Sequence, residues 1–353
     1  MDTATDDAPR LAAAIRAIAR GETLVPETVE AAIGELLAGK AAPEQVGAFL
    51  TGLAVRGETA AELIAGARAM RSSAHKADLN ASADQPLLDT CGTGGLTWTS
   101  LNTSTASAIV LAACGVRVAK HGNRSVPPKT GSADVLEALG VDLDMDAARE
   151  RLCIETAGVT FLYARSHHSA MRHVAPVRAK LGIRTLFNLL GPLSNPAGAN
   201  RQVLGVFAPE WVDPMAEALL ALGVERAWVV HGTDGIDEVS IAGETQVAEI
   251  QKGDTRPRRF TLTPEQAGLP RTPLKALEGS SPEANAAAIT ALFGGETSPF
   301  RDAVCLNVAA GLVVCDAAPD LETGVRQAAA AIDGGKARAT LAALVDASHG
   351  RGG

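Results

Sequence analysis

The segment Asp89-Thr-Cys-Gly-Thr-Gly-Gly95 follows a short apolar run, and Asn102-Thr-Ser-Thr105 begins the next helical pattern. A strand, a glycine-rich loop and a helix in this order begin a parallel α/β unit. Glycines let a backbone approach a phosphate closely, and free N–H groups at the start of a helix attract anions. The hydroxyls of Ser104 and Thr105 add donors for phosphate and ligands for Mg²⁺. The segment therefore indicates an α/β fold and a phosphate-binding loop.

Taken alone, the same segment is equally compatible with an ordinary tight turn between a strand and a helix. The dinucleotide fingerprint is absent, because the third spaced glycine is missing and no ribose-binding acid follows about 20 residues later. The lysine of a P-loop is missing as well. These two nucleotide-binding motifs are therefore excluded for the segment.

Downstream of about Pro86, short apolar runs alternate with helical patterns, which implies a mainly parallel sheet with helices on its faces. The strands expected are Leu87–Asp89, Val116–Ala119, Val159–Tyr163, Val203–Phe207 and Ala227–Val230, with helices at Thr103–Cys114, Ala133–Leu139 and Met215–Leu222. An antiparallel stretch, Thr245–Ile250 and Arg258–Leu262, is expected before the Ala-rich C-terminal helices. Ligands of such sheets bind beyond the carboxyl ends of the strands, so the loops there are the candidate site.

Upstream of this region, the pattern predicts only short amphipathic helices. They cover Leu11–Ala19, Pro26 to near Gly39 and Pro43–Arg56, and a fourth begins with the capping box Thr59-Ala-Ala-Glu62. We therefore expect an α/β protein with a small N-terminal helical domain, residues 1–80, joined by helices from about 166–190. The larger α/β domain, residues 81–353, would contain the mainly parallel central sheet.

The charges are distributed unevenly along the 353 residues, whose net charge is 32 − 40 = −8. A negative net charge argues against broad, sequence-independent binding of nucleic acid, which requires a basic face. Two windows nevertheless contain no Asp or Glu. Residues 90–133 contain Arg117, Lys120, Arg124 and Lys129, and residues 156–209 contain Arg165, Arg172, Arg178, Lys180, Arg184 and Arg201. We interpret these windows as a local site for a small anion rather than as scattered surface charge.

The five cysteines include no C-x-x-C pair, and most of them lie in apolar runs, as buried thiols do. The acidic N-terminus lacks the basic-then-apolar pattern of a signal peptide. The apolar run Ala106–Val116 is too short to span a bilayer. We therefore expect a reduced, cytoplasmic location without membrane association.

Two further motifs carry chemistry. Lys120-His-Gly-Asn-Arg124 ends a strand, and its two cations, amide and imidazole suit a phosphate beside a hydroxyl or polar ring, although a solvated basic loop is the alternative. The adjacent carboxylates Asp237-Glu238 follow the loop His231-Gly-Thr-Asp-Gly235. Hard oxygen ligands suit Mg²⁺, which keeps waters and bridges to substrate phosphates. Ordinary surface acids are the alternative for this pair.

The histidines His167, His168 and His173 do not have zinc spacing, so a loop beside an aromatic substrate, or a helix start, is the better interpretation. Arg178 on the expected helix Ala170–Leu181 has a planar fork suited to a substrate carboxylate. The alternative for Arg178 is a surface helix arginine. The turn Phe187–Pro196 is interpreted as structural, and no G-x-S-x-G nucleophile elbow is present.

Together these motifs resemble the anthranilate phosphoribosyltransferase family over nearly the whole chain. The resemblance rests on six ordered blocks: Asp89–Gly95, Asn102–Thr105, Lys120–Arg124, Gly131-Ser-Ala-Asp-Val-Leu-Glu-Ala-Leu-Gly140, Arg184-Thr-Leu-Phe-Asn-Leu-Leu-Gly-Pro-Leu193 and Asp237-Glu-Val-Ser240. It implies a homodimeric enzyme of tryptophan biosynthesis that joins anthranilate to C1 of phosphoribosyl pyrophosphate (PRPP) and releases pyrophosphate. It also implies a requirement for Mg²⁺, with two ions expected.

The resemblance also implies a role for each matching residue. Gly92, Thr93, Gly94 and Gly95 would hold the pyrophosphate with Asn102, Ser104 and Thr105, while Lys120, Gly122, Asn123 and Ser132 would hold the phosphoribosyl part. Ser104 would contact one Mg²⁺, and Asp237 and Glu238 would hold a second. His121, Asn123 and Arg178 would line the anthranilate path, with Arg178 facing its carboxylate. Lys120, Asn123 and Arg178 are the catalytic candidates, and no general base is assigned, because an aromatic amine is largely unprotonated at pH 7.

Several positions depart from the family pattern beside the binding loops. Leu96 stands where Asp is usual, Thr97-Trp98 replaces a continuation led by Gly, and Pro127-Pro128 replaces a Ser-rich stretch. Arg165 and Ser169 stand where Pro is usual. These changes bear on Mg²⁺ handling and loop mobility rather than on the fold.

Two alternatives to the transferase remain at this point. A pyrimidine nucleoside phosphorylase shares this fold and a Lys-His motif, but the block Arg184–Leu193 and the pair Asp237-Glu238 favour the transferase. A non-catalytic binding protein of the same fold, with nucleic acid as partner, is opposed by the retention of Lys120, Asn123 and the acidic pair.

Overall fold

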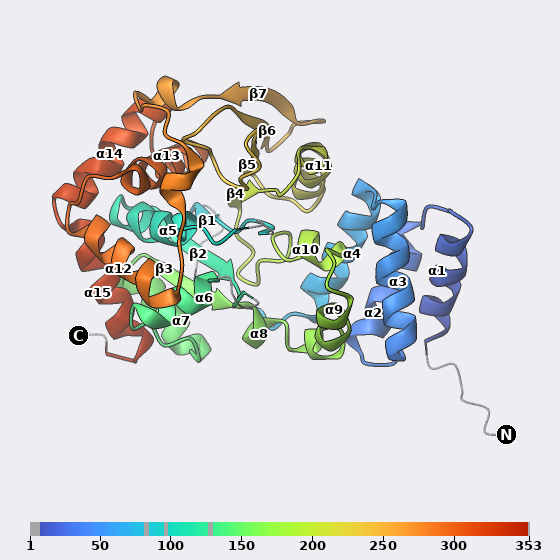
Figure 1. Cartoon of the computed structure of the whole chain (residues 1–353). Coiled ribbons are helices and arrows are strands. Elements are labelled where there is room, and N and C mark those ends of the chain that lie inside the picture. The colour runs from blue at the N-terminus through green and yellow to red at the C-terminus, as the bar shows by residue number, and fades with distance from the viewer. Residues whose placement is uncertain (1–7, 81–84, 95–97, 126–129, 352–353) are drawn as a thin grey trace.

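The computed structural model describes residues 8–80, 85–94, 98–125 and 130–351. A helical bundle lies beside a larger part built on a sheet, and the bundle contains the N-terminal helices (Figure 1). These helices are α1 (Pro9–Ala19), α2 (Pro26–Leu37), α3 (Pro43–Arg56) and α4 (Ala60–Ser73). A later segment returns to the bundle as α8 (Ala164–His167), the 3-10 helix η1 (Ser169–His173), α9 (Ala175–Leu181) and α10 (Leu186–Leu190).

The first helices form where the sequence predicts them, because each has a favourable start. Proline occupies the first turn of α1, α2 and α3, where its missing N–H has no intrahelical partner to lose. At α4 the expected capping box is present: the Thr59 hydroxyl accepts from the Glu62 N–H at 3.3 Å, and the Glu62 carboxylate accepts from the Thr59 N–H at 2.9 Å. The buried Glu62 carboxylate also accepts from Leu24 N–H at 2.9 Å, which fixes the approach to α2.

The larger part contains a seven-stranded sheet in the order β3-β2-β1-β4-β5-β6-β7. The first five strands in this order are parallel, and β6 and β7 are antiparallel additions at one edge. The strands are β1 (Leu87–Asp89), β2 (Arg117–Gly122), β3 (Val159–Tyr163), β4 (Arg201–Gly205), β5 (Arg226–Gly232), β6 (Thr245–Gln251) and β7 (Arg258–Leu262). The prediction of a mainly parallel sheet followed by an antiparallel stretch is confirmed.

The helices cover both faces of the sheet, and strand alternation explains the two cores. On β5, Trp228 and Val230 belong to one core, whereas Ala227 and Val229 belong to the other. The first core packs against α5 (Thr103–Ala113), α7 (Ala147–Thr156), α12 (Pro282–Phe293), α13 (Pro299–Val314), α14 (Leu321–Asp333) and α15 (Lys336–Ser348). The second core joins α11 (Val212–Ala221) to the bundle helices, so the bundle is packed directly against one face of the sheet.

The remaining elements are α6 (Ser132–Ala138) and the 3-10 helices Pro209–Trp211, Pro264–Ala267 and Leu274–Leu277. One predicted helix is wrong in detail. Ala170–Leu181 is not continuous, because η1 ends at His173 and α9 begins after Val174, next to Pro176. Pro176 lacks the N–H that a continuous helix would need at this position, and proline is tolerated in the first turn of a new helix. Among the described residues, no helix combines the length and the apolar character needed to cross a membrane.

Candidate active site

The loops at the carboxyl ends of β1, β2, β4 and β5 lie together, as the parallel order requires. The β1 and β4 loops are joined by two hydrogen bonds. Thr93 N–H donates to the Gly205 carbonyl at 2.9 Å, and the Phe207 N–H donates to the Thr93 hydroxyl at 3.0 Å. The predicted phosphate loop, which follows β1 in sequence, is therefore held against the end of β4.

The glycine-rich loop packs directly against the acidic pair. Gly94 N–H donates to Asp237 Oδ2 at 2.8 Å, and Gly94 has a φ of +64°, a left-handed conformation that glycine adopts without strain. At Gly205, a Cβ atom would lie 1.6 Å from the Asp237 carbonyl oxygen. The absence of a side chain at Gly205 is what lets the end of β4 and the Asp237 loop come into contact.

The Glu238 carboxylate lies at the start of α5, whereas the neighbouring Asp237 carboxylate bonds the glycine-rich loop. Ser104 N–H donates to Glu238 Oε1 at 3.2 Å, close to the positive end of the helix dipole. Burial raises the pKa of Asp237, and burial together with the neighbouring Asp237 charge raises the pKa of Glu238 to about 8. Two adjacent carboxylates that repel each other in a partly buried place are a donor set that a hard cation such as Mg²⁺ fits.

Lys120 supplies the buried positive charge of the site. Its side chain is buried, and its Nζ donates to the Ser104 hydroxyl at 3.3 Å and to the Thr90 carbonyl at 3.4 Å. The ammonium group thus joins the end of β2 to the start of α5. An anion seated on the β1 loop would meet both Lys120 and the Ser104 hydroxyl.

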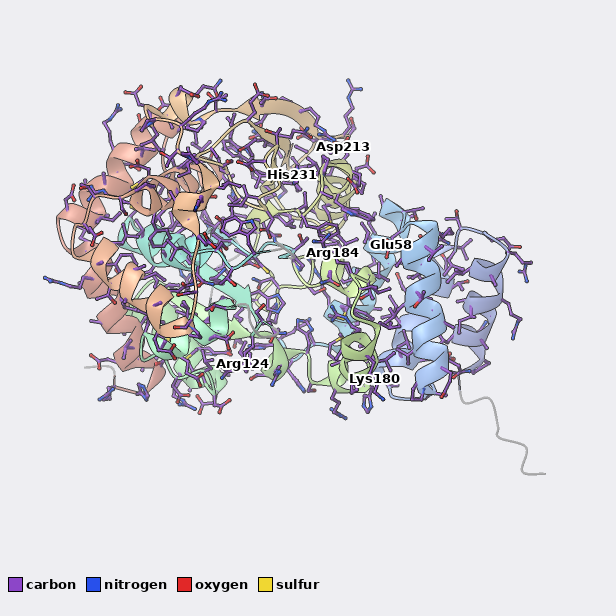
Figure 2. All side chains as sticks on the ribbon, viewed as in Figure 1. Glu58, Arg124, Lys180, Arg184, Asp213 and His231 are labelled. Atoms are coloured by element: carbon purple, nitrogen blue, oxygen red, sulfur yellow. The ribbon has the colours of Figure 1, made fainter. Side chains whose placement is uncertain are left out.

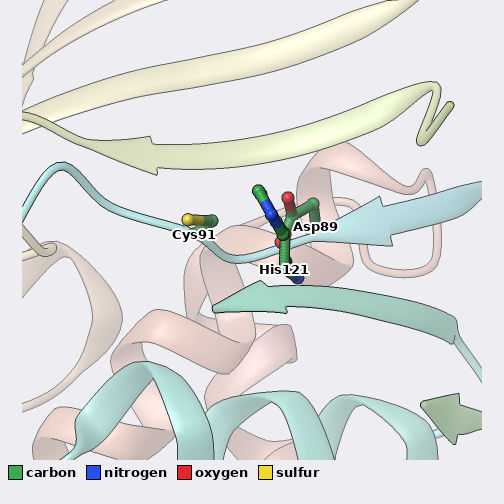
Figure 3. Close-up of side chains that lie close together, drawn as sticks. All are labelled: Asp89, Cys91 and His121. Carbon is green, nitrogen blue, oxygen red and sulfur yellow. Dashed lines mark hydrogen bonds between the residues drawn. The ribbon is translucent and has the colours of Figure 1, made fainter. Parts of the chain in front are cut away.

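Asp89, Cys91 and His121 lie close together beneath this loop (Figure 3). The three potential ligand atoms lie within 4.8 Å of one another. The Asp89 carboxylate already accepts from His121 N–H at 3.1 Å and from Asn195 Nδ2 at 2.8 Å, and the Lys120 charge acts on it. Burial raises the pKa of Asp89 to about 6 and also raises the pKa of the Cys91 thiol. We assign this cluster to holding the strand ends in place, because its carboxylate is already engaged.

His121 and His168 face each other, with ring centroids 5.1 Å apart. Both rings are buried, and within the described residues their nitrogens form no hydrogen bond of normal geometry. Burial lowers the pKa of His121 to about 3 and that of His168 to about 4. Both imidazoles are therefore neutral at pH 7, and they present polar ring edges that suit an uncharged aromatic amine.

Arg178 lies on α9, next to α10. Its Nη2 donates to Asn188 Oδ1 at 3.2 Å, and its guanidinium carbon lies 5.6 Å from the centre of the Phe187 ring. The Nε atom is buried and has no hydrogen-bond partner among the described residues, and burial lowers the pKa of this arginine. A partly desolvated guanidinium with a donor left over is suited to a planar carboxylate.

Several other basic residues of the two acid-free windows are used elsewhere. Arg124 pairs with Asp134 at 3.0 Å and with Glu137 at 2.7 Å, and Arg201 pairs with Glu225 at 2.6 Å. These acids lie outside the windows in sequence but beside the arginines in space, so the windows overstate the positive charge available to a ligand. Arg184 lies where the bundle meets the sheet-containing part, with its guanidinium 4.2 Å from the Phe207 ring centre (Figure 2).

The structure distributes the three histidines of the 167–173 stretch over different roles. His168 faces His121, whereas the His167 ring bonds Glu150 Oε1 and the His75 carbonyl, each at 2.8 Å. His173 is exposed and packs over Gly39. Burial alone would lower the pKa of His167, but the Glu150 hydrogen bond and charge outweigh it and raise the pKa. His167 thus holds together the two chain segments that connect the bundle to the sheet.

The remaining residues that the sequence singled out lie on several segments around the site. Asn123 is exposed, and its carbonyl accepts from the Ser132 hydroxyl at 3.3 Å. Ser169 hydrogen-bonds the His75 ring at 3.1 Å, and Arg165 is exposed on α8. A Cβ at Gly122 would lie 2.4 Å from Ser132 Oγ, so this glycine permits the close approach of the two loops. The predictions for Gly95, Leu96, Thr97, Pro127 and Pro128 concern positions outside the described residues.

Three buried asparagines shape the site and were not identified from the sequence. Asn195 donates to Asp89 and to the Ala119 carbonyl at 2.9 Å, and Asn307 bonds both the N–H and the carbonyl of Val239 at 3.0 Å. Asn285 bonds the loop before α5. An asparagine on an otherwise apolar helix such as α13 is a signal of this kind of anchor, but it does not say what the side chain holds.

The chain matches two family models in sequence. Residues 12–74 match the helical bundle domain of a glycosyl transferase family, and residues 84–338 match the a/b domain of that family. Among curated relatives, the anthranilate phosphoribosyltransferase of Hyphomonas neptunium is 62% identical over 95% of this chain and 97% of its own length. That of Rhodospirillum rubrum is 52% identical over 94% of each chain.

Solved structures agree with these matches. The anthranilate phosphoribosyltransferase of Thermus thermophilus is 47% identical, with a TM-score of 0.88 over 95% of this chain and 99% of that one. The Saccharomyces cerevisiae enzyme in complex with PRPP and Mg is 26% identical, with a TM-score of 0.88 over 96% and 98%. The same yeast enzyme in complex with 4-fluoroanthranilate has a TM-score of 0.87 over 98% and 99%.

Proposed function

The chain belongs to the anthranilate phosphoribosyltransferases of this glycosyl transferase family, and from this premise we propose how its own residues perform the reaction. The enzyme transfers the phosphoribosyl group of PRPP to the amine of anthranilate and releases pyrophosphate, a step of tryptophan biosynthesis. The contact between the glycine-rich loop and the pair Asp237-Glu238 carries this assignment. It places phosphate donors and cation ligands within one hydrogen bond of each other.

The pyrophosphate end of PRPP would lie on the β1 loop and the start of α5. Gly92, Thr93, Gly94 and Gly95 would surround it, and the helix N-terminus with the Ser104 and Thr105 hydroxyls would supply further donors. Lys120 lies 3.3 Å from the Ser104 hydroxyl and would neutralise charge on the same group. The ribose and its 5-phosphate would continue toward Gly122, Asn123 and Ser132 on the next loop. Asn102 would complete the first loop.

The carboxylates of Asp237 and Glu238 and the Ser104 hydroxyl supply oxygen atoms, which are the ligands that Mg²⁺ prefers, and Glu238 bonds the Ser104 N–H. The yeast structure with PRPP and Mg supports a requirement for this ion. We propose two ions, one held by Ser104 and one by the acidic pair. When bound, Mg²⁺ neutralises the developing charge of the leaving pyrophosphate. Titration of bound Mg²⁺ in the presence of PRPP would give the number of sites, and a stoichiometry of one would contradict this part.

Anthranilate would bind between the sheet and the bundle segment. The neutral rings of His121 and His168 would contact the aromatic amine, and Arg178 would bind the carboxylate through its unpartnered Nε side. The yeast complex with 4-fluoroanthranilate supports an aromatic acid as the acceptor in this fold. The anthranilate amine would thus approach C1 of the ribose from the side opposite to the departing pyrophosphate.

In the transfer, the bond between C1 and the pyrophosphate oxygen breaks while the bond between C1 and the amine nitrogen forms. The ribose becomes positive in the transition state, and the amine proton passes to solvent. Lys120 stabilises the departing charge, and His121, Asn123 and Arg178 hold the amine in line. No general base is assigned, because His121 and His168 have lowered pKa values and the amine is already unprotonated.

The direct test is turnover of anthranilate by the purified chain with PRPP and MgCl₂, followed by the loss of anthranilate fluorescence. We expect turnover that depends on both substrates and on Mg²⁺, with one pyrophosphate released per anthranilate consumed. Absence of turnover at all Mg²⁺ concentrations, or phosphorolysis of a pyrimidine nucleoside in its place, would contradict the proposal.

The role of Arg178 is tested by replacing it with alanine. We expect Arg178→Ala to raise the KM for anthranilate about tenfold or more while changing the KM for PRPP less, because a charge-assisted pair contributes about 1.5–3 kcal/mol. Lys180→Ala is the matched control, since Lys180 is an exposed cation on the same helix. A larger effect on the KM for PRPP would reject the assigned role.

We also propose that two chains associate through the helical bundle, which we treat as one domain formed by residues 1–80 and about 166–190. The exposed large apolar side chains among the described residues are Val25, Val55 and Ile183, and all three lie on bundle segments. Light scattering after gel filtration tests the dimer, and Val55→Asp should weaken it if the bundle is the contact.

The five free cysteines support a reduced, cytoplasmic location, which a fluorescent fusion would test.

A further inference from the structure

Four residues form a closed ring of hydrogen bonds above the site. Asn285 Nδ2 donates to Asn102 Oδ1 at 2.9 Å, and Asn102 Nδ2 donates to the Thr130 carbonyl at 3.2 Å. The Thr130 hydroxyl donates to the Ser280 carbonyl at 2.6 Å, and the Ser280 N–H returns to Asn285 Oδ1 at 3.0 Å. Every member donates once and accepts once in this cycle. Apart from Ser280 and Asn285, the members lie far from one another in sequence, so the ring forms only in the folded chain.

Asn285 is the buried centre of the ring. It lies on α12 and is 1% exposed, and its Nδ2 also donates to the Ser100 carbonyl at 3.0 Å. The chain before it is fixed as well: Ser281 caps α12, and a Cβ at Gly279 would lie 2.7 Å from Asn285 Oδ1. A buried primary amide with all its hydrogen-bonding groups engaged has one orientation, which makes it a rigid connector.

The ring joins the two loops that are proposed to hold opposite ends of PRPP. Asn102 is the residue before α5 and belongs to the pyrophosphate loop, whereas Thr130 comes just before Ser132 on the ribose side. Both amide ends of Asn102 are used inside the ring, so its side chain positions the loop and its substrate contact would come from the backbone. The ring therefore sets the distance between the pyrophosphate and ribose ends of the site.

We propose that Asn285 is a positioning residue for PRPP, acting through the ring so that the two loops bind this substrate as one unit. The inference rests on the proposed function and adds to it a residue about 150 positions away from Thr130 in sequence. We therefore expect loss of the ring to weaken the binding of PRPP. The binding of anthranilate, which is proposed to contact the bundle segment, should remain largely unchanged. Misplacement of binding groups by small distances is enough to cost tenfold or more.

The first test compares Asn285→Ala with Thr290→Ala. Thr290 lies on the same helix and is exposed, and its hydroxyl bonds only the Ala286 carbonyl of that helix among the described residues. We expect Asn285→Ala to raise the KM for PRPP about tenfold, with the KM for anthranilate at saturating PRPP changed less than twofold. Thr290→Ala should leave both unchanged. Equal increases in both KM values, or none, would overturn the proposal.

The second test uses the exposed end of the ring, where folding is not at risk. Thr130→Val removes the hydroxyl that bonds Ser280, and Thr130→Ser keeps it. We expect Val to raise the KM for PRPP about threefold to tenfold and Ser to retain the wild-type value. Because the ring acts as a unit, Asn285→Ala with Thr130→Val should be less damaging than the product of the single effects. Full multiplication of the two effects would contradict a ring.

The third test measures the binding of PRPP directly through its effect on thermal stability. The rise in melting temperature caused by PRPP with Mg²⁺ should be smaller in Asn285→Ala and in Thr130→Val than in wild type, and equal in Thr290→Ala. Wild-type turnover measured in parallel separates the two hypotheses. No wild-type turnover contradicts the proposed function, whereas wild-type turnover with unaltered PRPP constants in both ring variants contradicts only the ring.

Discussion

Two glutamates eleven positions apart, Glu238 and Glu249, occupy buried places of opposite character. Glu249 on β6 accepts from Arg226 Nη2 at 2.9 Å, from Trp228 Nε1 at 3.0 Å and from Arg258 Nε at 3.1 Å. Burial would raise the pKa of Glu249, but these donors outweigh it and lower the pKa to about 2. Glu238 accepts from Ser104 N–H beside a second carboxylate, and its pKa rises to about 8.

The difference separates a structural carboxylate from a candidate functional one. Glu249 has enough positive donors to remain charged, so its ion pairs contribute to the stability of the sheet edge. Glu238 and Asp237 lack that compensation within the described part of the protein, and a cation with its substrate would supply it. The lowered pKa of Glu249 reflects a carboxylate whose hydrogen bonds and ion pairs are all supplied by the protein. The raised pKa of Glu238 reflects a carboxylate that lacks such ion pairs among the described residues and is free to bind a ligand.

The largest expected effect is on stability, and it follows from replacing the structural carboxylate Glu249. Glu249→Gln should lower the free energy of unfolding by about 3 kcal/mol, because it removes the charge of a buried carboxylate that bonds Arg226 and Arg258. The KM values for both substrates should remain unchanged. Urea unfolding measures this loss, and Arg259→Ala, which breaks the exposed pair with Asp213, is the control expected to cost below about 1 kcal/mol. Equal losses in the two variants would remove the distinction.

The functional side should respond in the opposite way. Glu238→Gln should lower kcat/KM about 100-fold, equivalent to about 2.7 kcal/mol of transition-state stabilisation, because it removes a charge from the proposed cation site. Its stability should equal or exceed that of wild type, since the repulsion with Asp237 disappears. Kinetics over a range of Mg²⁺ concentrations and urea unfolding check both statements. A destabilised variant with normal kinetics would place Glu238 among the structural carboxylates.

The smallest effect is a dependence of stability on pH. A folded pKa near 8 means that the metal-free protein loses the Glu238 contribution as the pH rises from about 4.5 through 8. Gln does not titrate, so the advantage of Glu238→Gln should grow over this range, to about 1 kcal/mol because the carboxylate is partly solvated. Glu249 has the opposite sign: its contribution is present above about 4.5 and is lost as the pH falls toward 2. Urea unfolding of wild type and Glu238→Gln without Mg²⁺ at several pH values measures this dependence. A stability difference between the two proteins that does not change with pH would contradict the prediction.

The sequence predicted elements whose determinants are local. The start of α4 follows from Thr59 and Glu62, which are neighbours in sequence, and the strands of the parallel sheet follow from apolar runs with helical spacers. The helix Ala170–Leu181 is expected from the sequence as one element, but the structure divides it into η1 and α9, with Pro176 in the first turn of α9. Pro176 has no N–H to donate within a continuous helix, so the predicted element is interrupted before it.

Partners distant in sequence were beyond this reasoning. Arg124 and Arg201 were interpreted with the anion-binding windows, yet each has an acidic partner in space. Asn195, Asn285 and Asn307 carry no motif, and their importance rests on which loop each one meets. A hydrogen bond such as the one between Asn285 and Asn102 joins residues too far apart in sequence to leave a periodicity to detect.

By itself, the sequence determined the α/β class, the helical start of the chain and the segments that carry Lys120, Arg178 and the acidic pair, because turns, caps and strand ends are set by neighbouring residues. Only the tertiary structure decided which charges remain for ligands. Burial, and the donors that other elements bring to each carboxylate, make Glu238 a candidate ligand for a cation and Glu249 a structural one. Charge environment is a property of the assembled fold, since it sums over residues that the chain brings together only when folded.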